Sequence, residues 1–230
     1  MNNKALNSRR LSRIKTGVFV LALLPLIKLA ISACIDGLGA NPIEKITRTT
    51  GYWTLALLLI TLSATPLRLL WGWYWPIRIR RMLGLFAFFY GSLHFLTYLV
   101  LDQFFDWAAI ADDIAKRPYI TVGFPSFVLM IPLAITSTDR MIKRLGGKRW
   151  RLLHLLIYPI ATGGVVHFVW LVKKDLTNPL IFAVVLAILF GVRVLNRIMR
   201  YVKSSIRVCK EHSHVREPFM DTEGDRQFPQ

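Results

Sequence analysis

Cysteine, carboxylates and charged residues in general are scarce in this chain of 230 residues. Only two cysteines occur, Cys34 and Cys209, and neither belongs to a CxxC pair. A disulfide framework and a zinc site of the usual spacing are therefore excluded. Asp and Glu together number 13, and charged residues make up 19% of the chain, below the roughly 25% of soluble domains. Because the apolar excess is gathered into long blocks, a soluble globular enzyme is excluded as well.

Apolar residues are abundant instead, at 54% of the chain, with a mean hydropathy of +0.44. Long hydrophobic blocks and 12% aromatic residues also exclude intrinsic disorder. A helix needs roughly 20 apolar residues to cross the hydrocarbon core of a membrane. The sequence therefore predicts an all-α integral membrane protein, a six-helix transmembrane bundle with spans near residues 17–34, 51–67, 82–101, 119–136, 152–172 and 180–195.

The basic residues set the expected orientation of the six spans. Of 30 Lys and Arg, 22 lie in the segments that are cytoplasmic if the N-terminus is inside, and 6 lie in the three outer loops. This asymmetry predicts cytoplasmic N- and C-termini, with residues 1–16 and the polar tail 201–230 on the inner side. The formal charge of +17 is then explained by topology and anionic lipid of the bilayer, so no nucleic-acid partner is expected.

Three of the five histidines, His94, His154 and His167, fall inside predicted spans. An ionisable side chain in hydrocarbon needs a partner, so it indicates a functional site. The simpler interpretation is a neutral imidazole that makes an interhelical hydrogen bond. Three such residues on two helices favour the functional interpretation. The other two, His212 and His214, lie in the polar tail, where solvation is expected.

Two of these histidines, His94 and His167, are expected at similar depth in the membrane. His94 lies about 18 Å along its span from Met82, and His167 about 22 Å from Leu152, at a rise of 1.5 Å per residue. Both spans run from inside to outside, so the two imidazoles reach similar depth in the outer half of the bilayer. Two facing imidazoles are the axial ligands of a six-coordinate haem. Zinc is disfavoured because no Cys, Asp or Glu is nearby to complete a tetrahedral set.

His154 precedes His167 by 13 residues, which places it about 20 Å away on the same helix and about 140° around it. Pro159 and the glycine pair at 163 and 164 lie between them, and such residues bend helices, although close helix packing explains them equally well. A haem at the level of His154 would meet Arg80 and Arg81 on the third span instead of a second histidine. An arginine suits a propionate or phosphate better than iron.

The inner rim carries aromatic and basic side chains. The segment Trp71-Gly-Trp-Tyr-Trp75 precedes the first basic cluster, and this is the composition of an interfacial aromatic belt with its positive-inside flank. The alternative is a docking surface for an anionic aromatic group such as FMN. Its candidate phosphate or propionate contacts are Arg78, Arg80, Arg81, Lys148, Arg149, Arg151 and Tyr158. One loop expected on the outer side is acidic, with Asp102, Asp106, Asp112 and Asp113. These carboxylates either keep the loop solvated or steer a partner protein.

A series of motifs in order resembles the MsrQ (YedZ) family, relatives of the ferric reductase-like transmembrane domain. The motifs are Arg80-Arg-Met-Leu-Gly-Leu85, Ser92-Leu-His-Phe-Leu-Thr-Tyr98, Arg117-Pro-Tyr119, Thr136-Ser-Thr138, Leu145-Gly-Gly-Lys-Arg-Trp150, Leu153-His154 with Tyr158, and His167. The resemblance covers residues 10–200 and marks 17–200 as the haem domain.

The resemblance implies a bacterial inner-membrane protein with haem b and FMN. Electrons would come from the quinone pool or a cytosolic flavin reductase, and would pass to a periplasmic molybdopterin-dependent methionine sulfoxide reductase catalytic subunit. By position, His94 and His167 match the outer haem ligands and His154 the inner histidine. Sulfoxide reduction itself would lie on the other subunit.

Two other functions fit parts of the pattern. A transporter with a histidine relay expects paired carboxylates within the spans, and no acidic residue falls in a predicted span. A membrane anchor without redox chemistry is distinguished only by a cofactor assay.

Overall fold

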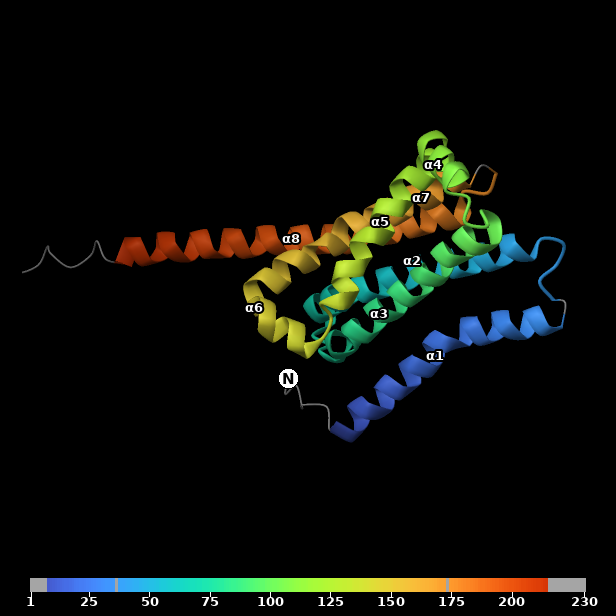
Figure 1. The fold of residues 1–230 in the computed structure, drawn as a ribbon. Coiled ribbons are helices and arrows are strands. Elements are labelled where there is room, and N and C mark those ends of the chain that lie inside the picture. The colour runs from blue at the N-terminus through green and yellow to red at the C-terminus, as the bar shows by residue number, and fades with distance from the viewer. Residues whose placement is uncertain (1–7, 36, 173, 215–230) are drawn as a thin grey trace, which may run out of the picture. The chain divides into compact units, whose positions relative to one another are not determined.

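The computed structural model describes residues 8–35, 37–172 and 174–214, and only the backbone of Ser8 and of residues 207–214. Within this part of the chain every regular element is helical (Figure 1). The predicted side-chain environments of Cys209, His212 and His214 lie outside the described residues. The elements are α1 (Ser8–Cys34), α2 (Pro42–Trp71), α3 (Trp75–Leu96), the π-helix η1 (Thr97–Asp102), α4 (Trp107–Lys116), α5 (Pro118–Ile135), α6 (Asp139–Leu153), the 3₁₀ turn η2 (His154–Leu156), α7 (Ile157–Leu171) and α8 (Thr177–His214).

Six helical stretches are long and apolar enough to cross a membrane, which confirms the predicted all-α, six-span architecture. They are Arg9–Cys34, Pro42–Trp71, Trp75–Asp102, Pro118–Ile135, Asp139–Leu171 and Thr177–Ile206. Each except the fourth is longer than predicted, because polar turns at the ends of a helix lower local hydropathy without ending the helix. Glu44, Asp102 and Asp139 consequently lie at the ends of these stretches.

Local capping explains where α2 begins and ends. The side chain of Asn41 accepts a hydrogen bond from the backbone N–H of Glu44 at 3.1 Å, and Pro42 occupies the first helical turn, where its missing N–H costs nothing. At the other end, Gly72 adopts a left-handed conformation with φ of 69° and donates its N–H to the carbonyl of Arg68. That conformation favours glycine, which has no Cβ atom to clash.

The fifth span differs most from the prediction. Residues 137–151, expected to be a cytoplasmic loop, are mostly helix α6, and the chain bends within it at Gly146, where φ is 75°. The Gly146–Gly147–Lys148 segment therefore lies in a broken helix. A 3₁₀ turn at His154 then joins α6 to α7. Helix α4, in the loop between the third and fourth spans, was not predicted either, because its ten residues are too few to form a span.

Four helices form the core of the bundle. Helix α2 packs against α3 and α7, and α5 packs against α7 and α3 (Figure 1). Their contacts bury Leu62, Ala87, Ile160 and Ala161 almost completely. The first turns of α8 join this core through Phe182, whose ring meets Tyr52 of α2 edge to face at 5.2 Å. This four-helix core contains the site described below, near the ends of α3 and α7 and the starts of α2 and α5.

A tyrosine hydroxyl bridges two backbone groups of α1. Tyr90 of α3 donates to the carbonyl of Ala22 at 2.8 Å and accepts from the N–H of Leu26 at 3.2 Å. These two backbone groups are four residues apart and would pair with each other in an uninterrupted helix. Pro25 lies between them, and a proline with an inserted side chain is a usual cause of a helix kink.

Of the described residues, those up to Leu189 form one compact unit, and residues 190–214 belong to a second. Within the second unit, α8 runs on as helix to His214. The predicted end of the sixth span, near residue 195, therefore lies inside a continuous helix.

Candidate functional site

His94 of α3 and His167 of α7 lie opposite each other. Their ring centroids are 6.1 Å apart and their ring planes are nearly perpendicular, at 88°. Both side chains are half-buried. The structure thus brings together the two histidines that the depth argument paired.

Each of these rings is held by a backbone carbonyl of a neighbouring helix. Nδ1 of His94 lies 2.9 Å from the carbonyl oxygen of Thr47 on α2, and Nδ1 of His167 lies 2.7 Å from that of Tyr119 on α5. A carbonyl oxygen only accepts, so each Nδ1 carries the proton and donates it. Nε2 of each ring therefore keeps its lone pair, and within the described residues neither Nε2 makes a hydrogen bond.

This geometry fits a metal ion between two neutral imidazoles. Metal–nitrogen bonds of about 2 Å on both sides, with a ring radius of about 1 Å added at each end, separate two ring centres by about 6 Å. The observed 6.1 Å agrees with this separation. Among the described residues, no group of three or more His, Cys, Asp or Glu side chains could hold a metal ion. A metal at this place would need its remaining ligands from a non-protein group, as the macrocycle of haem provides.

His154 has a different environment. Its ring stacks on Trp150 at 4.0 Å, and its Nε2 lies 3.2 Å from Oγ1 of Thr136. That hydroxyl already donates its proton to the carbonyl of Pro132 at 2.6 Å, so Nε2 of His154 is the donor. His154 therefore carries its proton on the opposite nitrogen from the other two intramembrane histidines.

Two arginines predicted near His154 are indeed its neighbours. Arg80 and Arg81 both act electrostatically on His154. Arg81 pairs with Asp139 at 2.6 Å, whereas Arg80 is half-buried and interacts with Tyr158. The other basic residues predicted to contact an anion have exposed side chains: Arg78, Lys148, Arg149 and Arg151. The structure thus distinguishes Arg80 and Tyr158 from the rest of that set.

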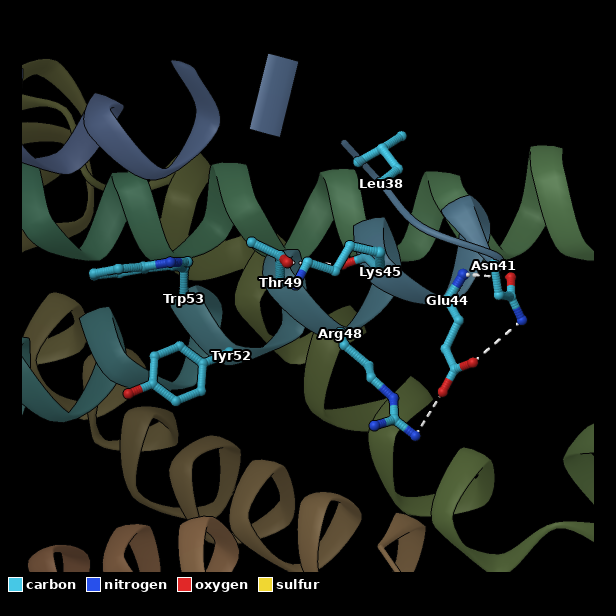
Figure 2. A pocket seen from close by; sticks show the side chains of 8 residues that line it. All are labelled: Leu38, Asn41, Glu44, Lys45, Arg48, Thr49, Tyr52 and Trp53. Atoms are coloured by element: carbon cyan, nitrogen blue, oxygen red, sulfur yellow. Dashed lines mark hydrogen bonds and ion pairs between the residues drawn. The ribbon is translucent and has the colours of Figure 1, made fainter. Parts of the chain in front are cut away.

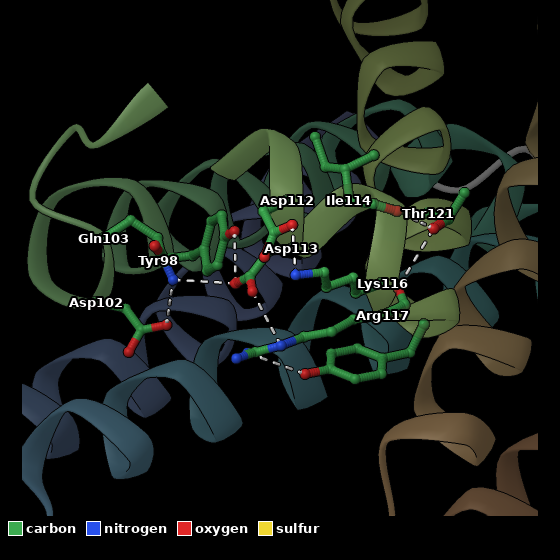
Figure 3. A network of polar contacts seen from close by, with 10 residues as sticks. Tyr98, Asp102, Gln103, Asp112, Asp113, Ile114, Lys116, Arg117 and Thr121 are labelled. Atoms are coloured by element: carbon green, nitrogen blue, oxygen red, sulfur yellow. Dashed lines mark hydrogen bonds and ion pairs between the residues drawn. The ribbon is translucent and has the colours of Figure 1, made fainter. Parts of the chain in front are cut away.

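The acidic loop between the third and fourth spans is a structured network (Figure 3). Asp113 accepts hydrogen bonds from the hydroxyl of Tyr98 at 3.2 Å and the amide of Gln103 at 3.1 Å, and pairs with Arg117 at 3.0 Å. Arg117 in turn donates to the hydroxyl of Tyr119 at 3.4 Å, and this hydrogen bond raises the pKa of the Arg117 guanidinium. The network therefore reaches Tyr119, whose carbonyl oxygen accepts the hydrogen bond of His167.

The remaining acidic residues of this loop also have local partners. Asp106 caps α4 by accepting from the N–H groups of Ala108 and Ala109 at 3.0 Å, and Asp112 pairs with Lys116 at 2.8 Å. These contacts favour a role in building the loop over the alternative of a surface that steers a partner.

A separate pocket of about 520 Å³ lies at the first turns of α2 (Figure 2). Eight residues line it: Leu38, Asn41, Glu44, Lys45, Arg48, Thr49, Tyr52 and Trp53. The ion pair between Arg48 and Glu44, at 2.6 Å, lies on its wall. The pocket shares its helical turns with Thr47, the residue that holds His94.

The carbonyl partners at Thr47 and Tyr119 could not be predicted from the sequence. Both contacts use backbone oxygen, which every residue has, so no residue type marks them. Arg117-Pro-Tyr119 belonged to the motifs of the resemblance, but nothing in it pointed to a contact with His167.

Comparisons with known proteins agree with this architecture. Residues 46–165 match the family described as ferric reductase-like transmembrane component. Similar proteins include several named protein-methionine-sulfoxide reductase heme-binding subunit MsrQ. The protein of Azospira oryzae is 58% identical over 83% of this chain and 82% of its own length. That of Rhodospirillum rubrum is 56% identical over 83% and 91%, and that of Herminiimonas arsenicoxydans is 57% identical over 80% and 86%.

No solved structure matches the chain significantly. The six membrane-spanning helices and these relatives identify a multi-pass protein of the bacterial inner membrane. From the extent of the matches, the chain belongs to the MsrQ family of ferric reductase-like transmembrane proteins.

Proposed function

We propose that this chain is a membrane electron-transfer subunit that holds haem b between His94 and His167. Electrons would pass from it to a periplasmic methionine sulfoxide reductase catalytic subunit. The family membership supports a membrane redox subunit, and the relatives' names describe a heme-binding subunit of such a reductase. The residues of this chain fit the group, because two neutral imidazoles supply both axial positions.

The observation that carries the proposal is the pair of Nδ1–H bonds to Thr47 and Tyr119. They fix the tautomer in which Nε2 is unprotonated, and only that nitrogen can bind a metal. Haem b supplies a one-electron iron couple at such a site. Hydrogen bonding of the distal N–H raises the basicity of a ligating imidazole and fixes its orientation. The carbonyls of α2 and α5 therefore hold both rings ready for the ligand role.

The inner half of the bundle is proposed as the entry side for electrons. There Arg80 and Tyr158 would hold the phosphate of FMN or a haem propionate, with His154 as a candidate ligand of an inner haem through Nδ1, the nitrogen that keeps its lone pair. The donor would be the quinone pool or a cytosolic flavin reductase. With both termini in the cytoplasm, the His94–His167 pair lies in the outer half, near a periplasmic, molybdopterin-dependent partner.

Optical spectroscopy of the purified chain tests the ligand assignment. The dithionite-reduced α-band of haem b should disappear in His94→Ala and in His167→Ala, because each variant lacks one axial ligand. A full b-type spectrum in both variants would refute the proposal. His154→Ala tests whether the chain holds one haem or two. The variant should keep the full α-band intensity if His154 binds no iron, and should lose about half of it if His154 is a ligand of an inner haem.

Electron transfer is tested with the catalytic subunit. Without oxygen, a small amount of the oxidised catalytic subunit plus excess methionine sulfoxide should reoxidise the chemically reduced chain completely. The subunit alone should accept only as many electrons as it can store, and methionine sulfoxide alone should accept none. A reduced chain that stays reduced in the presence of both would exclude the proposed partner.

A further inference from the structure

The two carbonyls that hold the histidines share a feature of sequence position. Thr47 is followed by Gly51 on α2, and Tyr119 is followed by Gly123 on α5, in both cases four residues later. In each pair the histidine ring that bonds the carbonyl also lies against the glycine. The same arrangement therefore occurs twice, on two different helices of the four-helix core.

Helix geometry explains the spacing of four. The carbonyl oxygen of residue i points along the helix towards residue i+4, whose N–H it accepts. Side chains of a helix lean back towards its N-terminus, so the side chain at i+4 covers the surface beside that oxygen. A glycine at i+4 leaves the oxygen open from the side. An incoming imidazole can then reach it as a second donor.

The space at both glycines is filled by the rings themselves. A Cβ atom at Gly51 would lie 3.0 Å from both Nδ1 and Cε1 of His94. A Cβ atom at Gly123 would lie 2.5 Å from Nδ1 of His167 and 3.0 Å from its Cε1. By contrast, a Cβ at Gly84 of α3 would meet only a methyl group of Thr61, at 3.9 Å. An alanine is therefore accommodated at Gly84, whereas at Gly123 it must displace the ring of His167, and at Gly51 the ring of His94 must shift by a few tenths of an ångström.

We propose that Gly51 and Gly123 are positioning residues for the two iron ligands. Each glycine lets an imidazole lie flat on its helix and donate Nδ1–H to the carbonyl one turn earlier. In this way α2 and α5 set the depth, the tilt and the basicity of ligands that α3 and α7 carry. The role in ligand geometry rests on the function proposed above, whereas the steric contact does not.

The experiment compares Gly51→Ala and Gly123→Ala with the matched control Gly84→Ala in purified protein. Haem affinity should fall about 10–100-fold in the two test variants, the range for loss of a partner that orients a metal ligand. The loss should be larger for Gly123→Ala, where the contact is closer. Haem that remains bound should show a higher midpoint potential, because a less basic imidazole favours ferric iron less. Its ferric EPR signal should change in anisotropy, which reports the angle between the ring planes. Gly84→Ala should match the unmodified chain.

Double variants keep the test decisive if a single variant does not accumulate. Gly51→Ala should be tolerated in the His94→Ala background, and Gly123→Ala in the His167→Ala background, because the displaced ring is gone. Poor accumulation that persists in these backgrounds would assign the glycines to helix packing and overturn the inference. So would single variants with the haem content, potential and EPR signal of Gly84→Ala. If His94→Ala and His167→Ala keep haem, the proposed function fails instead, and the double variants still test the contact.

Discussion

Nη1 of Arg117 donates a hydrogen bond to the hydroxyl of Tyr119 at 3.4 Å. The backbone oxygen of the same tyrosine holds His167 at 2.7 Å. One residue of α5 thus connects the charged surface of the acidic loop between the third and fourth spans to an imidazole of the proposed haem site. This connection gives the loop a structural role in the site.

Loss of Arg117 should loosen this connection. Arg117→Met removes the pairing with Asp113, whose side chain is only 13% exposed and which keeps two further donors. We expect a loss of about 1 kcal/mol in the free energy of unfolding. The matched control is Lys116→Met, which breaks an i,i+4 pair of the same helix with Asp112, at 54% exposure, and should cost about 0–0.5 kcal/mol. Thermal unfolding in detergent measures both, and equal losses would contradict the prediction.

Tyr90→Phe should destabilise the packing of α1 on α3. Without the hydroxyl, the carbonyl of Ala22 and the N–H of Leu26 each lose their hydrogen bond to Tyr90 in an apolar setting. A buried polar group left unsatisfied costs about 1–3 kcal/mol. Tyr74→Phe, at a side chain 55% exposed, is the control and should change stability by less than about 0.5 kcal/mol. Thermal unfolding in detergent measures the stability of both variants. If Tyr90→Phe melts at the same temperature as Tyr74→Phe and the unmodified chain, the hydroxyl of Tyr90 does not contribute to stability.

Arg80→Gln should release an anionic cofactor group more than substitution of other inner basic residues does. Its half-buried guanidinium lies near His154 and Tyr158, whereas Arg144 on α6 is exposed and provides the control Arg144→Gln. Flavin fluorescence of the denatured protein and the haem-to-protein ratio measure the bound groups. If both variants retain flavin and haem as fully as the unmodified chain, Arg80 holds no anionic group.

The two cysteines of the chain test the predicted orientation directly. Cys34 ends α1 and is exposed, on the side predicted to be periplasmic, and Cys209 follows the sixth span in the sequence. A membrane-impermeant maleimide applied to intact spheroplasts should label Cys34 and leave Cys209 unlabelled. Cys34→Ala should abolish the labelling. Labelling that survives in Cys34→Ala and disappears in Cys209→Ala would reverse the orientation.

The number of spans could be predicted from sequence because apolar runs are dictated by the thickness of a bilayer. Helix ends could not, because they depend on caps such as Asn41 and Gly72, which hydropathy does not register. Helix α6, which lies where a loop was predicted before His154, could not be predicted for the same reason. Its charged turns have the low hydropathy of a loop.

The site was accessible to sequence reasoning only in part. The rise per residue along the two spans predicts similar depths for His94 and His167, and the structure places their rings opposite each other. Their role as iron ligands stays a prediction. The environment of His154 could not be foreseen, because Thr136 approaches it from another helix. Gly51 and Gly123 escaped notice because a glycine within an apolar helix has many explanations until its neighbour is seen.

The anchoring of both rings on main-chain oxygen has a consequence for which sequence changes the fold tolerates. Side chains at positions 47 and 119 can be exchanged without removing the acceptor atom. A single-residue insertion or deletion earlier in α2 or α5 would instead rotate the acceptor by about 100° away from the ring. The geometry of the two histidines should therefore depend more on the unbroken register of α2 and α5 than on which residue types occupy positions 47 and 119.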